Sequence, residues 1–158
     1  IGGSYYVGTD TTSTGFELEA AGHITDRWSL NGGFTAFKLR DDSHTNPSPY
    51  IPNRTLKLGT SYSVPEWNDL KLGAQLRWQG RIHYDDPGVT TVSGNDAIVR
   101  QGSYAVLDLM AGVDVVDHLR ATLNVRNVTD KKYLASLLWG QAFYAEPRAA
   151  TFSLTYRY

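Results

Sequence analysis

Hydrophobic and polar residues alternate with a period of two in one segment of this chain after another. The last segment shows the pattern most clearly, with Phe152, Leu154, Tyr156 and Tyr158 alternating with Thr151, Ser153, Thr155 and Arg157. Successive side chains of a β-strand point to opposite faces, so this alternation is typical of strands with one apolar and one polar face. It predicts an all-β, antiparallel chain with seven strands, at residues 16–24, 30–38, 56–63, 70–79, 105–115, 119–126 and 151–158.

The connections between these segments alternate between short and long. The short ones are residues 25–27, 65–69 and 116–118, and the long ones are residues 41–52, 82–102 and 135–146. Outer-membrane β-barrels have this asymmetry, because their periplasmic turns are tight and their extracellular loops are longer. We therefore predict an antiparallel transmembrane β-barrel in a bacterial outer membrane, with the C-terminus on the periplasmic side.

The composition leaves two all-β architectures open. With 41% hydrophobic residues and a mean hydropathy of −0.34, the chain would suit a soluble β-sandwich. A barrel strand also has modest average hydropathy, because it shows lipid only every second residue. The aromatic residues favour the barrel: Trp78, Tyr156 and Tyr158 lie at the ends of apolar faces, where interfacial girdles are found.

Strand parity predicts a barrel that is larger than this chain. Single-chain bacterial barrels have an even number of strands with both ends normally periplasmic, whereas seven strands that end in the periplasm must begin outside the cell. The Gly-, Ser- and Thr-rich residues before Gly15 are then expected to end an extracellular loop. The first six residues have no export-signal pattern, so we expect the signal and further strands upstream.

Several function classes have no residues to support them. A net charge of −1 argues against a nucleic-acid partner, and the absence of cysteine removes thiolate sites. No Ser–His–Asp arrangement is evident, so an enzyme is not expected. We also expect no metal site, because none of the histidines shares a recognisable ligand spacing with another: His23, His44, His83 and His118.

Four segments together resemble TonB-dependent receptors. The segment Asn127-Val128-Thr129-Asp130-Lys131-Lys132-Tyr133 resembles that family's C-terminal asparagine–leucine–x–aspartate–lysine–x–tyrosine signature, although Thr129 departs from it. The other segments similar to the family are Gly15–Ala20, Tyr104–Ala111 and Glu146–Arg148 with the alternating run to Tyr158. The nearest resemblance is to ferric-siderophore receptors, particularly in residues 139–148.

This resemblance implies a 22-stranded barrel whose lumen is closed by an N-terminal plug. Residues 1–158 would be the C-terminal segment of that barrel, with the plug and the TonB-contacting region outside it. Such a receptor binds a ferric siderophore and imports it with energy transmitted by TonB. Iron would be cargo, so no cofactor is implied. A passive porin-type barrel and a soluble β-sandwich binding module remain as alternatives.

Two sets of site residues follow. The terminal aromatic strand of such proteins is recognised by the outer-membrane assembly machinery, and this role falls on Phe152, Leu154, Tyr156 and Tyr158, which are also expected to face the lipid bilayer. Aromatic and cationic residues in the long loops are candidates for siderophore contact: Trp139, Tyr144, Tyr84, His83 and Arg81. The alternative for Trp139 and Tyr144 is the outer aromatic belt, and for Arg81 it is ordinary lumen polarity.

Overall fold

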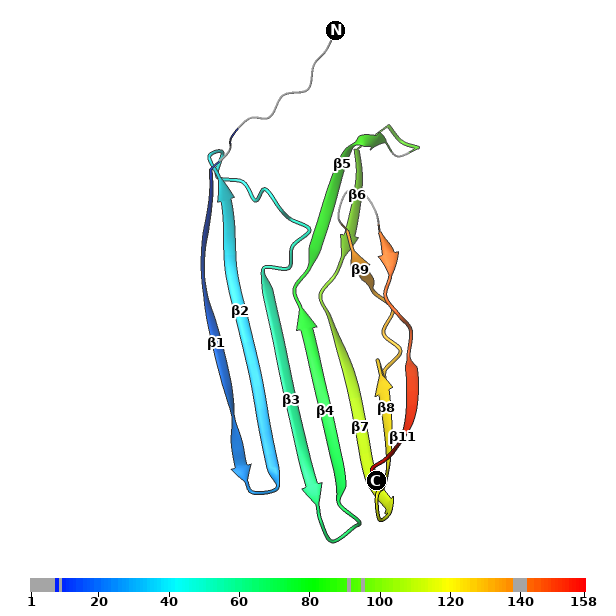
Figure 1. Ribbon diagram of the computed structural model, residues 1–158. Coiled ribbons are helices and arrows are strands. Elements are labelled where there is room, and N and C mark those ends of the chain that lie inside the picture. The colour runs from blue at the N-terminus through cyan, green and yellow to red at the C-terminus, as the bar shows by residue number, and fades with distance from the viewer. Residues whose placement is uncertain (1–7, 9, 91, 95, 138–141) are drawn as a thin grey trace.

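The computed structural model describes residues 8, 10–90, 92–94, 96–137 and 142–158, and the side chains of these except 86–90 and 96. The described elements are β-strands (Figure 1). In chain order they are β1 (Thr11–Thr25), β2 (Trp28–Asp41), β3 (Arg54–Val64), β4 (Leu70–Gln79), β5 (Ile82–Thr90), β6 (Asp96–Gln101), β7 (Tyr104–Val116), β8 (Leu119–Arg126), β9 (Leu134–Ser136), β10 (Phe143–Tyr144) and β11 (Ala149–Tyr156).

Seven strands form one antiparallel sheet in the order β1-β2-β3-β4-β7-β8-β11. These are the seven strands that the alternation predicts, and each pairs with its neighbour in the predicted order. The remaining strands form two small pairs, β5 with β6 and β9 with β10, inside the second and third long connections. The alternation missed these pairs, because β6, β9 and β10 are short and β5 runs into the turn-like residues Asp85-Asp86-Pro87-Gly88, which break the period of two.

The prediction that a loop extends to Gly15 is wrong for residues 11–14. β1 begins at Thr11, and β2 continues to Asp41, so that Thr12 pairs with Arg40 and Thr14 with Lys38. Threonine is β-branched and suits a strand, which explains why a polar stretch continues the sheet. The first hairpin is therefore longer than the apolar alternation alone indicates.

The two ends of the sheet differ in their connections (Figure 1). At one end, here called the turn end, lie the tight turns at residues 26–27, 65–69 and 117–118 together with the C-terminus. At the other, the loop end, lie the long connections at residues 42–53, 80–103 and 127–148. The turns use residues that tolerate a positive φ, at Asn68 (52°), Asp69 (52°) and His118 (67°). The predicted sorting of short and long connections is confirmed.

An ion pair joins two neighbouring turns at the turn end. Arg27 and Glu66 lie 2.5 Å apart between guanidinium and carboxylate. The pKa of Glu66 is lowered from its ordinary 4.5, first by a hydrogen bond from its own backbone N–H and then by Arg27. The pair is therefore fully present above pH 4.5 and is lost as the pH falls through the lowered pKa of Glu66. The Arg27 side chain is 49% exposed and the Glu66 side chain 56%, so water screens the ion pair and its contribution to stability is small.

One face of the seven-stranded sheet is apolar from edge to edge. The register aligns Leu58 with Leu76, Leu76 with Leu107, and Leu123 with Phe152. The contact between Phe16 and Phe34, with ring centroids 5.8 Å apart, lies on the same face. Nothing in the described chain covers this face: Leu58 is 45% exposed and Phe152 64%. A soluble sandwich would bury such a face under a second sheet, whereas the described residues form a single layer.

The opposite face is polar and carries ion pairs and hydrogen bonds between neighbouring strands. Thr35 donates to Glu17 across β1 and β2, and Arg77 pairs with Asp108 across β4 and β7. An open hollow of about 580 Å³ extends over this side of the sheet from β2 to β11, and its polar lining includes Asn31, Gln75, Asp108, Asn124, Arg126 and Thr151. None of the described residues forms a helix of the length and apolarity needed to cross a membrane.

Candidate functional site: the loop end of the polar face

Asn127 stands at the point where β8 ends and the third long connection begins. It is 4% exposed and is the only buried polar residue among those that the structure describes. Its φ of 50° lies in the left-handed region, which asparagine tolerates better than most residues. This backbone conformation breaks the extended geometry of β8, which ends at Arg126.

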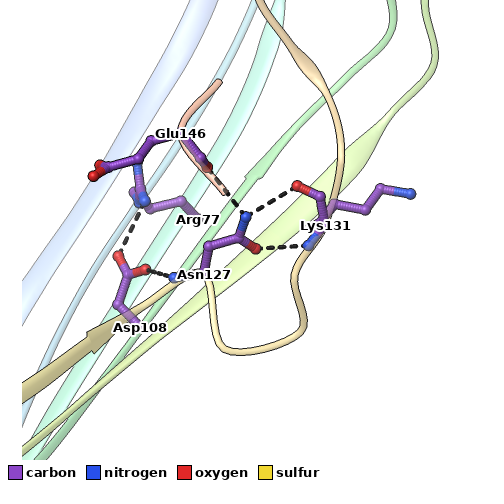
Figure 2. Close-up of polar contacts among 5 residues, drawn as sticks. All are labelled: Arg77, Asp108, Asn127, Lys131 and Glu146. Carbon is purple, nitrogen blue, oxygen red and sulfur yellow. Dashed lines mark hydrogen bonds and ion pairs between the residues drawn. The ribbon is translucent and has the colours of Figure 1, made fainter. Parts of the chain in front are cut away.

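The Asn127 side chain holds the base of the connection together (Figure 2). Its Oδ1 accepts from the Lys131 backbone N–H at 2.8 Å, and its Nδ2 donates to the Lys131 carbonyl at 3.0 Å. The same Nδ2 donates to the Glu146 carbonyl at 3.4 Å, although these residues are 19 positions apart. One buried amide therefore links both ends of the segment 131–146, and a buried amide without such partners would be unfavourable.

Asp108 ties this base to the sheet (Figure 2). Its Oδ1 accepts the Asn127 backbone N–H at 2.8 Å, and its Oδ2 accepts from the Arg77 guanidinium at 3.0 Å. Asp108 lies on β7 and Arg77 on β4, so the contacts span three neighbouring strands of the polar face. A carboxylate shared by a guanidinium and a backbone amide makes charge-assisted hydrogen bonds, which are stronger than neutral ones.

Two further contacts join the start of the third long connection to its end, just before β11. The Arg126 guanidinium pairs with the Glu146 carboxylate at 2.9 Å. The Asp130 carboxylate accepts the Arg148 backbone N–H at 2.9 Å. We call Arg77, Asp108, Asn127, Asp130 and Glu146 the loop anchor. It makes the third long connection a closed loop that leaves the sheet and returns to it at one fixed place.

Aromatic rings lie directly beyond the loop anchor. Tyr104 and Tyr133 stack with centroids 4.2 Å apart and planes at 25°. The Lys132 ammonium lies 4.4 Å from the centroid of Tyr144, within the range of a cation–π contact. Tyr144 is 62% exposed, so most of its ring remains available to a ligand.

A second aromatic group joins the first and second long connections. Tyr50 and Tyr84 lie with ring centroids 6.1 Å apart, and the His83 backbone N–H donates to the Pro49 carbonyl at 3.1 Å. His83 also lies 3.9 Å from the Asp85 carboxylate. These contacts hold β5 against the 42–53 connection.

The predicted contact residues fall into separate places at the loop end. Tyr84 and His83 lie together on β5, Arg81 is exposed just before that strand, and Tyr144 lies on β10 beside Lys132. Trp139 lies outside the described residues. No recorded contact between described residues joins Tyr84 to Tyr144. Of the predicted assembly-signal residues, Phe152, Leu154 and Tyr156 lie on β11, exposed by 59–65%, and Tyr158 follows the strand.

Sequence reasoning did not single out Asp108, Arg77 and Tyr50. The alternation marks Asp108 and Arg77 only as polar-face residues, and no local pattern shows that they meet. One feature of the sequence could have drawn attention to Asp108: it is the only acidic residue in the apolar run Tyr104–Ala111. In the part of the chain that the structure describes, no three His, Cys, Asp or Glu residues are grouped to hold a metal ion.

Comparison with known proteins decides the family. A family model described as "TonB dependent receptor-like, beta-barrel" matches residues 2–128. The chain belongs to the TonB-dependent receptor family. Membership confirms the resemblance seen in the sequence and places the chain in the outer membrane of a Gram-negative bacterium. In this membrane the uncovered apolar face of the sheet is the face toward lipid, and the polar face is the face toward the lumen.

The similar proteins of this family are siderophore receptors. The chain is 33% identical over 153 residues to the ferripyoverdine receptor of Pseudomonas aeruginosa, covering 94% of this chain and 18% of that receptor. It is 31% identical over 148 residues to the catecholate siderophore receptor Fiu of Escherichia coli K12, covering 89% and 19%. These relatives are transport receptors and not enzymes.

A solved structure agrees with the fold. The crystal structure of the ferripyoverdine receptor of the outer membrane of Pseudomonas aeruginosa, bound to ferripyoverdine, matches with a TM-score of 0.84 at 32% identity. The match covers 92% of this chain and 19% of that receptor chain. The chain thus spans about a fifth of the length of the TonB-dependent receptors that it matches.

Proposed function

We propose that this chain is the C-terminal segment of the barrel of a TonB-dependent receptor that binds a ferric siderophore and imports it with TonB-transmitted energy. The complete barrel would have 22 strands around a plug, and iron would enter as cargo without a protein-bound cofactor. The observation that carries the proposal is the match along nearly the whole chain, loops included, to receptors for ferripyoverdine and for catecholate siderophores.

The geometry of the loop end supports the same function. A siderophore complex offers an organic, polar surface to the receptor, and both aromatic faces and cations suit such a surface. Tyr144 with Lys132, and Tyr84 with Tyr50, provide rings that are already held in place by neighbouring residues. Rings that are held before binding lose less conformational entropy when the ligand arrives.

Transport by the complete receptor tests the proposal. We expect cells that produce the full-length protein to accumulate iron-59 from a ferric pyoverdine or a ferric catecholate, and to lose this uptake when TonB is deleted. A passive porin would admit small solutes whether or not TonB is present. Uptake that does not depend on TonB, or no binding of either siderophore class, would overturn the proposal.

A ring at the loop end is expected to contribute directly to affinity. In the full-length receptor, Tyr84→Ala should weaken siderophore binding about tenfold, because one aromatic contact is worth ~1.4 kcal/mol. Quenching of intrinsic fluorescence by the ferric siderophore measures the affinity. Trp67→Ala is the matched control, because Trp67 is an exposed ring in a tight turn at the opposite end of the sheet. Equal affinities for both variants and wild type would exclude Tyr84 as a contact.

The assembly role of the last strand can be separated from its place facing lipid. We expect Phe152→Ser with Tyr156→Ser to lower the amount of receptor in the outer membrane several-fold, whereas Thr151→Ala with Thr155→Ala, on the other face of β11, should not. The purified double variant should still fold into pure lipid vesicles if the assembly machinery reads these rings. Failure to fold in vesicles as well would mean that the rings act only through lipid contact.

A further inference from the structure

The lipid-facing side of β2 changes character near the loop end. Leu30, Phe34 and Ala36 lie on the apolar face, and the next two residues on that face are Lys38 and Arg40. The pairing of β1 with β2 runs without a shift from Thr11 opposite Asp41 to His23 opposite Ser29, so the alternation of faces is preserved throughout. The apolar belt on β2 therefore ends at Ala36, and cations take its place.

Neighbouring strands extend this change into a patch. Arg54 begins β3 and pairs with Ala36, which puts it on the same face and diagonally beside Lys38. Diagonal neighbours across a strand pair are about 7–8 Å apart, close enough for two cations to share one phosphate group. On β1 the residues opposite Lys38 and Arg40 are Thr14 and Thr12. We call Lys38, Arg40 and Arg54 with these two threonines the outward cation patch.

The three cations have no counter-ion among the residues that the structure describes. All three are exposed, and none forms an ion pair with any described residue. Asp41 is next in sequence but lies on the other face, where its carboxylate accepts two hydrogen bonds from Thr45. Two acids flank the patch just beyond the strand ends, Asp10 before β1 and Asp42 after β2, and neither forms an ion pair among the described residues. The patch therefore presents three cations that are not held by an ion pair with any described residue.

We propose that the outward cation patch binds the phosphate groups of the glycolipid in the outer leaflet of the outer membrane. The inference rests on the proposed orientation of the receptor, with the loop end outside the cell. Acyl chains would pack on the apolar belt, including the rings of Phe16 and Phe34. The headgroup phosphates would then lie level with Lys38, Arg40 and Arg54, which can donate charge-assisted hydrogen bonds to them.

The position of the patch favours a lipid, and not a soluble anion, as its ligand. A ferric siderophore or another solute approaches the lumen side of the sheet, where Lys57 and Arg77 lie. The patch is on the opposite side, continuous with the lipid-facing belt. Cations at the edge of an apolar belt keep their stems against lipid and their charges at the headgroup level.

Native mass spectrometry of the full-length receptor in detergent tests the proposal, with bis-phosphorylated lipid A as the probe. We expect Lys38→Gln with Arg40→Gln to weaken lipid A binding about 25-fold, at roughly fivefold for each cation near an anionic headgroup. Adding Arg54→Gln should weaken it about fivefold more. Lys57→Gln with Lys71→Gln removes the same charge from the lumen face and should leave lipid A binding unchanged.

Lipid A without phosphates separates phosphate recognition from acyl-chain contact. Wild type should bind it about as weakly as the double variant binds the phosphorylated form. Equal binding of phosphorylated lipid A by wild type and the Lys38 and Arg40 variant would overturn the proposal, as would equal binding of both lipids by wild type. Siderophore binding measured on the same samples keeps the two proposals apart. If wild type binds no siderophore but the lipid difference persists, only the proposed function fails.

Discussion

Replacing Leu58 with arginine is expected to destabilise the full-length receptor by about 2–4 kcal/mol, the cost of arginine at the bilayer midplane on the lipid face of a barrel. Leu58 lies mid-strand on β3, aligned with Leu76 on one side and Gly32 on the other. It is 45% exposed in the chain itself. Around a soluble protein a half-exposed leucine would tolerate arginine within about 0.5 kcal/mol, because water would solvate the charge. The loss of stability would therefore report contact of residue 58 with lipid and not a change in packing within the chain.

Urea unfolding of the receptor in lipid vesicles measures this effect, and Gln75→Arg is its control. Gln75 aligns with Gly59, one residue beyond Leu58, so it lies at nearly the same depth but on the lumen face. It also aligns with Asp108, whose carboxylate would attract the new cation. We expect this control to change the free energy of unfolding by less than about 1 kcal/mol. Similar small costs at both positions would contradict the assignment of the apolar face to lipid.

Replacing Asn127 with leucine is expected to release the third long connection from the sheet. Leucine has the same number of side-chain heavy atoms, branched at the same carbon, but makes none of the three side-chain hydrogen bonds to Lys131 and Glu146. Leaving a buried backbone group without its hydrogen-bond partner lowers stability by about 1–3 kcal/mol. Because the Lys131 amide bonds to the Asn127 side chain, its hydrogen exchange should accelerate about tenfold or more, as 1.4 kcal/mol corresponds to a factor of ten.

Hydrogen exchange followed by mass spectrometry, on peptides covering residues 127–137, measures this release. Asn124→Leu is the matched control, since Asn124 lies on β8, three residues before Asn127, and lines the polar hollow. Siderophore affinity should fall in the Asn127 variant and not in the control, because Tyr144 and Lys132 lose their fixed position. Unchanged exchange at Lys131 would show that the loop anchor does not depend on this amide.

The class of fold could be predicted from the sequence because a strand in a membrane wall has only two environments. Each residue of the main strands faces either lipid or the lumen, so the pattern from Phe152 to Tyr158 is readable without any tertiary information. Loop lengths are likewise local quantities, and their sorting predicted the two ends of the sheet. The prediction failed at Thr11–Thr14, where the strand continues beyond the apolar belt and the polar residues carry no alternation to read.

The loop anchor could not be predicted, since its members are distant in the sequence. Arg77 and Asp108 are 31 residues apart, and Asn127 and Glu146 are 19 apart. Only the register of β4, β7 and β8 brings them together, and one shifted residue would turn Asp108 toward lipid. The same reasoning applies to Arg54 and Lys38, which the sequence separates by a long connection. Local alternation thus determined which face each residue occupies, while strand pairing decided which residues of a face meet.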